Sequence, residues 1–196
     1  MRFKPPPNSN PHVNTGWRVE FRTMELQVTD FENAALVTFL VLLSRAILAF
    51  DLDLLIPISL VDENMKRAQM RGACLSQKFY FKPMAASSGL IEEMSLDEIM
   101  NDSTFGLVNI VRAYLRMESM NMDVSTRAKI EAYLKLIENK ASGKCKTTAT
   151  WMRDFVVNHK SYQFDSVVSD DIAYDLMWEL CQISNGLFEC PELNGI

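Results

Sequence analysis

The sequence predicts an α+β fold that is mostly α-helical, with one or two strands near the N-terminus and a helical body after them. The prediction depends on a strictly alternating segment over 17–22, a long apolar run over 34–50, and apolar residues at helical spacing in most of the remainder. A chain of 196 residues that is 48% hydrophobic can bury a core. We expect one domain, or at most two.

The N-terminal segment divides into a loop and a strand. Residues 1–16 hold four of the seven prolines and are expected to form a proline-rich loop. Residues 17–28 are expected to form a sheet strand, because apolar and charged residues alternate strictly over its first half, 17–22. The apolar face, which we expect to be buried, carries Trp17, Val19 and Phe21. The charged face carries Arg18, Glu20 and Arg22.

The charged face presents a cation, an anion and a second cation at intervals of about 7 Å, twice the strand repeat of about 3.3 Å per residue. A carboxylate suits a hard cation such as Mg²⁺, and guanidinium groups suit phosphate or carboxylate oxygens. The row therefore fits a site that handles Mg²⁺ and phosphate. The same alternation is also typical of a solvated sheet face with cross-strand ion pairs, and the pattern alone leaves both interpretations open.

Residues 29–196 are expected to form the helical region. Thr29 and Glu32 form a capping box, which predicts a helix from there to about Phe50. Because this helix is apolar almost all round, other elements should cover it. Its apolar run of 17 residues is shorter than the ~20 that a bilayer needs and contains Ser44-Arg45, so we interpret it as a buried helix rather than a membrane span.

The later elements follow from local signals. Ile56-Pro57 is expected to interrupt regular secondary structure, and a helix is predicted from Asp62 to about Arg71. An aromatic run over 78–82 predicts a strand or an extended segment, and a loop is expected over 84–94. A capping box at Ser95 opens a short helix to about Asn101. Four more helices are predicted by apolar stripes over 108–115, 130–141, 147–158 and 169–186.

Composition excludes several classes of protein. The net charge of −5 argues against a nucleic-acid-binding protein, which would show a basic stripe. The four cysteines are scattered without a CxxC pair, which disfavours a zinc site and favours free thiols in the cytoplasm. The first residues lack the apolar core of a signal peptide.

Several unusual strings occur in the order found in one known family. The segment from Trp17 to Asn33, preceded by MRFKPPP, resembles the eukaryotic glutamate–cysteine ligase catalytic subunit family, also called γ-glutamylcysteine synthetase. The resemblance continues through VDENM at 61–65, YLKLI at 133–137, KASG at 140–143, WMR at 151–153 and ECPEL at 189–193. It covers nearly all of residues 1–193 and is weakest over about 84–105.

The resemblance implies ATP-dependent ligation of the γ-carboxylate of L-glutamate to L-cysteine, the first step of glutathione biosynthesis. It also implies a glutamine-synthetase-like antiparallel sheet on which glutamates bind Mg²⁺. By position, Glu20 matches a metal-binding glutamate of that strand. Arg22 matches an arginine directed at phosphate and substrate, and is the catalytic candidate. Arg18 shares the face and is assigned only electrostatic support for phosphate and substrate binding.

The segment like Met1-Arg2-Phe3-Lys4 lies well inside a much longer chain in that family. We therefore expect this chain to be a C-terminal fragment of the catalytic subunit that is inactive alone. The alternative is a catalytically inactive short paralogue that acts as a helical binding or regulatory module. Ala128 stands where some relatives carry a cysteine, so a covalent link to a modifier subunit is not supported there, and a noncovalent modifier subunit is kept as a candidate partner.

Overall fold

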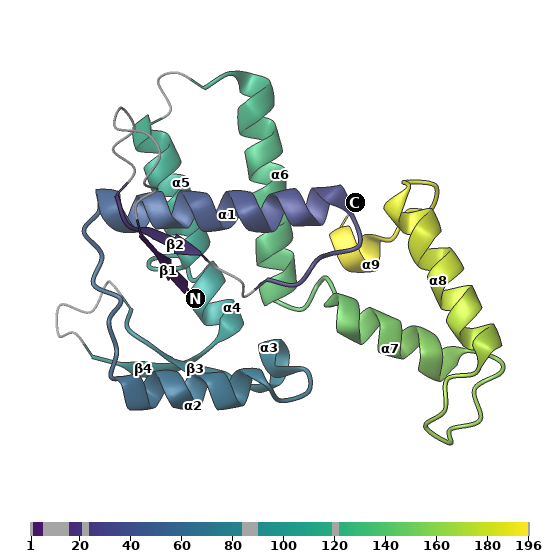
Figure 1. Cartoon of the computed structure of the whole chain (residues 1–196). Helices are drawn as coiled ribbons and strands as arrows, with labels where there is room; N and C mark the ends of the chain where they lie inside the picture. Colours follow the sequence, from purple (N-terminus) through teal and green to yellow (C-terminus); the bar gives the residue numbers. More distant parts are fainter. Residues whose placement is uncertain (1, 6–15, 21–23, 84–89, 119–121, 196) are drawn as a thin grey trace.

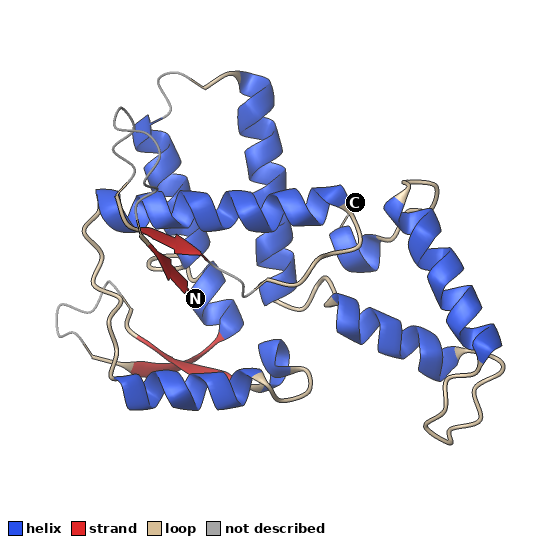
Figure 2. Ribbon diagram, in the orientation of Figure 1, coloured by secondary structure: helices blue, strands red, loops and turns tan. Residues whose placement is uncertain are grey.

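A computed structural model describes residues 2–5, 16–20, 24–83, 90–118 and 122–195 of the chain (Figure 1). It is mostly helical with short antiparallel strands (Figure 2), which confirms the predicted class. The strands are β1 (Arg2–Lys4), β2 (Arg18–Glu20), β3 (Lys78–Phe81) and β4 (Glu92–Ser95). The helices are α1 (Asp30–Ala49), α2 (Ile58–Ala68), α3 (Ala73–Ser76), α4 (Leu96–Asn101), α5 (Leu107–Glu118), α6 (Val124–Ala141), α7 (Thr148–Asn158), α8 (Asp170–Ser184) and α9 (Pro191–Asn194).

Within the described residues the strands form two separate antiparallel pairs. β1 pairs with β2, with Arg2 opposite Glu20 and Lys4 opposite Arg18. β3 pairs with β4 beside α2. β1 lies within the segment expected to be a proline-rich loop, and it ends before the proline run. An edge position beside β2 is available to this segment because Arg2, Phe3 and Lys4 all keep a backbone N–H.

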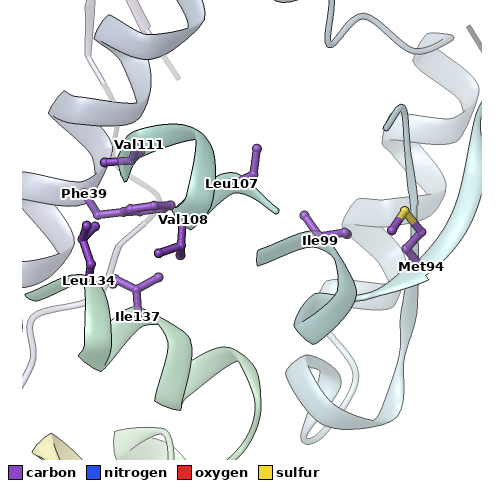
Figure 3. Packing of buried hydrophobic residues seen from close by; sticks show 8 residues of the cluster. All are labelled: Phe39, Met94, Ile99, Leu107, Val108, Val111, Leu134 and Ile137. Carbon is purple, nitrogen blue, oxygen red and sulfur yellow. The ribbon is translucent and has the colours of Figure 1, made fainter. Parts of the chain in front are cut away.

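Helix α1 is the centre of the main packing unit. Its N-terminus is the predicted capping box, since Glu32 N–H donates to Thr29 Oγ1 at 3.3 Å and Thr29 N–H donates to Glu32 Oε2 at 3.2 Å. α1 crosses both α5 and α6 (Figure 1). The Phe39 ring points into the space between these helices (Figure 3). The cluster extends from there to α4 and β4, and it consists of Phe39, Met94, Ile99, Leu107, Val108, Val111, Leu134 and Ile137 (Figure 3).

The expectation that other elements cover α1 on all sides is wrong for the described part of the chain. Val37, Val41 and Leu48 lie on its outer face and are 54–79% exposed. The cause is that α5 and α6 pack against the opposite side, where Ala35, Phe39 and Ala46 are buried. By length and composition α1 could also cross a membrane, and 22% of its most apolar window is buried.

Helices α7, α8 and α9 extend to one side of this unit (Figure 1) and have their own buried cluster. That cluster is formed by Trp151, Leu176, Ile183, Cys190 and Leu193. The predicted boundaries of α7 and α8 agree with the structure to within about two residues.

Three predicted boundaries need correction. The strand expected over 17–28 is β2, which covers Arg18–Glu20, and residues 24–28 are not in a strand, because β1 pairs with β2 over only three of the described residues of each strand. Helix α2 begins at Ile58 rather than Asp62, with Pro57 as its N-cap. The fixed backbone angle of proline is compatible with a helix start, so the residue interpreted as a break precedes the helix directly. The loop expected over 84–94 contains the start of β4 at Glu92. The residues of β4 lack a strong β preference. They form a strand because β3 supplies a pairing edge.

Candidate functional site

The β1–β2 pair brings Lys4, Arg18 and Glu20 to one face of the small sheet. Arg18 and Glu20 are two residues apart on β2, and Lys4 is directly opposite Arg18. Lys4 therefore lies diagonally across from Glu20. Its Nζ is 2.6 Å from Glu20 Oε2, and the two side chains are 44% and 27% exposed. The sheet thus holds the predicted metal-binding carboxylate against an ammonium group.

Arg18 is exposed, and its Nη2 donates a hydrogen bond to the carbonyl of Pro5 at 3.2 Å. This contact fastens the start of β2 to the end of β1. Arg22, the catalytic candidate, lies outside the described residues, so its place beside Glu20 stays a prediction. Of the three charged residues predicted to share a face, the structure brings together Arg18 and Glu20.

The aromatic side of the strand differs from the expectation. Trp17 is 71% exposed rather than buried. Within the described residues the sheet has two strands, β1 and β2, and an isolated two-stranded pair offers no second layer to cover an aromatic ring. Val19 and Phe21, the other two apolar positions, lie outside what the structure describes for side chains.

The segment that leaves this strand is anchored to the helical body. The side-chain oxygen of Asn33 accepts from Gln27 N–H at 2.9 Å, and its Nδ2 donates to the Gln27 carbonyl at 3.1 Å. Thr148 on α7 adds a hydrogen bond from its hydroxyl to Gln27 Oε1 at 3.3 Å. The chain that follows β2 is thereby tied to both α1 and α7.

A cavity of about 470 Å³ lies beside this anchored segment, between α1, α4 and α6. Its walls are mostly apolar, with Leu36, Phe39 and Ile137 among them. Its polar end contains Glu32 and Lys140, whose Nζ and Oε1 atoms are 2.9 Å apart. Glu25 adds a second carboxylate to the lining, so the cavity is largely apolar with a charged margin.

The described part of the chain offers few side chains that could hold a metal ion together. None of the described residues form a group of three or more His, Cys, Asp or Glu side chains that could hold an ion. Glu20 still suits Mg²⁺ as a single hard oxygen ligand, because Mg²⁺ is usually held by one or two carboxylates together with phosphates and waters. The ammonium of Lys4 lies against this carboxylate, 2.6 Å from Oε2.

Sequence reasoning missed Lys4 as a site residue. The signal was present, since Arg2-Phe3-Lys4 alternates charged and apolar residues as 17–22 does. The nearby prolines pointed to a loop, and the pairing of β1 with β2 could not be inferred from either segment alone.

The family model and the similar proteins point to the same family. The family model described as glutamate-cysteine ligase matches residues 1–183. The glutamate–cysteine ligase catalytic subunit of Mus musculus is 50% identical to this chain, over 100% of this chain and 33% of that protein. The subunit of Homo sapiens is 49% identical with the same coverage. The glutamate–cysteine ligase of Schizosaccharomyces pombe is 49% identical over 96% of this chain and 29% of that protein. The chain therefore spans about a third of the length of these relatives.

Proposed function

The chain belongs to the glutamate–cysteine ligase family, and we propose on this premise that it supplies the C-terminal part of an enzyme that makes γ-glutamylcysteine. The substrates would be L-glutamate, L-cysteine and ATP, with Mg²⁺ as cofactor and the cytoplasm as the location. The single observation that supports this most directly is the Glu20 carboxylate on a strand whose charged face also carries Arg18 and Lys4.

The chemistry explains why these residue types are needed. A carboxylate is a poor acyl donor, so glutamate must first be activated as an acyl phosphate. The transferred phosphoryl group carries negative charge that the site must neutralise. Glu20 would be one oxygen ligand of Mg²⁺, and the metal when bound supplies charge stabilisation at the phosphate. The guanidinium of Arg22 would bind phosphate and substrate oxygens in a bidentate manner, while Arg18 would add positive potential.

This chain alone should be inactive. Phosphate, glutamate and cysteine each need several contacts, and the described part of the sheet offers one carboxylate for a metal. The remaining metal ligands and the nucleotide pocket would come from sequence that the longer relatives have and this chain does not span. We therefore expect activity only in a polypeptide that contains those parts.

A second candidate function is a noncatalytic regulator that binds a full-length or modifier subunit without a covalent link. The exposed apolar faces favour this candidate, because Val37 and Val41 on α1, and Tyr174 and Trp178 on α8, are all more than 45% exposed. Large exposed apolar areas are typical of interaction surfaces. The native mass of the polypeptide, detected with an antibody against residues 187–196, separates the two candidates. A band several times heavier than 22.4 kDa favours the ligase, and a single band near 22.4 kDa favours the regulator.

The test of the catalytic proposal is Glu20→Gln in the full polypeptide that contains residues 1–196. We expect kcat to fall by roughly 100-fold or more at ordinary Mg²⁺ concentration, since a neutral amide is a much weaker ligand. Glu63→Gln on α2 is the matched control, because Glu63 is also partly exposed and ion-paired. Formation of γ-glutamylcysteine is the readout, and unchanged turnover of the Glu20 variant would remove Glu20 from the site.

A further inference from the structure

The contact between Lys4 and Glu20 assigns a role to a residue of β1. We propose that Lys4 binds phosphate in the ligase site, and that its ammonium rests on Glu20 only while that carboxylate holds no metal. This inference rests on the proposed function, because it assumes that Glu20 is a metal ligand. The evidence is the 2.6 Å contact between Lys4 Nζ and Glu20 Oε2 and the strand register that produces it.

The strand register keeps Lys4 at the site whether or not Glu20 holds a metal ion. Lys4 is opposite Arg18 in the antiparallel pair, so its side chain emerges on the same face as those of Arg18 and Glu20. The hydrogen bond from Arg18 Nη2 to the Pro5 carbonyl holds the two strand ends together. Only the flexible four-carbon stem of Lys4 has to move for its ammonium to leave Glu20.

Charge determines the direction of that movement. An ammonium group and Mg²⁺ compete for the same carboxylate oxygen, and the divalent ion repels the ammonium once it is bound. A phosphate group held at that metal would offer anionic oxygens that can accept hydrogen bonds from Lys4. A lysine is well suited to this change of partner, because its charge is compact and its three N–H donors are not confined to one plane.

Arg18 is less suited to the same role. Its guanidinium already donates to the Pro5 carbonyl, and leaving that acceptor would loosen the strand pair. Lys4 makes its described contact with the carboxylate itself, so its release is coupled directly to metal binding.

The test exploits effects of opposite sign. In the full polypeptide that contains residues 1–196, Lys4→Met should tighten the binding of Mg²⁺ alone about threefold or more, because a competing cation is removed. The same variant should weaken binding of the nonhydrolysable ATP analogue AMP-PNP about tenfold. Lys4→Arg, which keeps the charge, should restore most of the AMP-PNP affinity. Isothermal titration without glutamate or cysteine measures both affinities, so no turnover is needed.

Two controls define the result. Lys66→Met removes an exposed lysine of α2 whose ion pair with Glu63 is long, at 4.0 Å, and both affinities should stay unchanged. Glu20→Gln should weaken Mg²⁺ binding, and the Lys4→Met effect on Mg²⁺ should disappear in the double variant. If Lys4→Met weakens the binding of both Mg²⁺ and AMP-PNP, or changes neither affinity, the proposed role of Lys4 is overturned. If Glu20→Gln leaves Mg²⁺ binding intact, the metal role of Glu20 fails and the proposal for Lys4 fails with it.

Discussion

Glu32 and Lys140 form an ion pair that joins the first turn of α1 to the last turn of α6. Lys140 Nζ lies 2.9 Å from Glu32 Oε1, and Glu32 is completely buried. The second carboxylate oxygen accepts hydrogen bonds from the backbone and hydroxyl of Thr29, at 3.2 and 2.9 Å. Lys140 also donates to the Lys146 carbonyl at 2.8 Å. One carboxylate therefore caps a helix and fixes the crossing of two helices.

We predict that Lys140→Met strongly destabilises the fold, because it leaves the buried Glu32 charge without its partner. The expected loss is about 3–5 kcal/mol in the free energy of unfolding. Denaturation of the 196-residue chain in urea, followed by circular dichroism, measures it. The Glu63–Lys66 pair provides the matched control, since exposed pairs contribute only ~0–1 kcal/mol. A loss below about 1 kcal/mol for Lys140→Met would show that the pair is not needed for the helix crossing.

Arg22→Lys should be poorly tolerated by the complete enzyme. An ammonium keeps the charge but cannot form the two parallel hydrogen bonds of a guanidinium with phosphate or carboxylate. We expect kcat/KM for glutamate to fall at least on the order of tenfold, while the protein stays folded. Steady-state kinetics test this, and a near-normal kcat/KM would argue against Arg22 as a phosphate or substrate clamp.

Glu138 should make stability depend on pH in the acid range. Burial raises the pKa of this carboxyl, but hydrogen bonds from Arg112 and Lys135 outweigh that effect and bring the pKa below its usual value of 4.5. The stabilisation is therefore present above pH 4.5 and is lost as the pH falls through the lower, folded-state pKa.

Glu138→Gln removes this contribution at every pH. The difference in unfolding free energy between wild type and variant should be largest near pH 6 and should shrink below pH 4.5. Urea titrations at a series of pH values measure it. A difference that stays constant down to pH 3 would mean that Glu138 does not titrate with a lowered pKa.

The four cysteines should differ in reactivity. Burial raises the pKa of the Cys74, Cys145 and Cys190 thiols, which lowers their thiolate fraction. Cys181 is exposed on α8. We expect iodoacetamide to modify Cys181 on the order of ten times faster than the other three, and all four equally in guanidinium. Mass-spectrometric mapping of the labelled peptides tests this, and equal labelling in the native state would contradict the described burial.

Leu134→Ala should destabilise the main core by about 2–5 kcal/mol, because its fully buried side chain packs in the cluster around Phe39. Leu187→Ala is the control, since Leu187 is 68% exposed, and its effect should stay within about 0.5 kcal/mol. Thermal and urea unfolding of the two variants compare them. Similar losses for both would mean that α1, α5 and α6 do not form the main core.

Local signals were enough to locate most helices. The capping boxes at Thr29 and Ser95 start α1 and α4 where predicted, because a capping box involves residues only three positions apart. The alternation over 17–22 likewise predicted a strand and the shared face of Arg18 and Glu20. These features depend on neighbours along the chain. The resemblance of the sequence to the glutamate–cysteine ligase family also agrees with the comparisons.

The pairings between distant segments required the tertiary structure. Lys4 contacts Glu20 only because β1 and β2 pair across 13 or more intervening residues in a particular register. The Glu32–Lys140 contact joins residues 108 apart, and β4 forms because β3 lies beside it. The exposure of Trp17 and Val37 was likewise decided by which surfaces the packing leaves uncovered. The sequence by itself determined the helices, their caps and the charged strand, because these depend on short-range hydrogen bonding and periodicity. Only the tertiary structure decided which charges meet and which apolar faces stay open, because this depends on how the elements pack together.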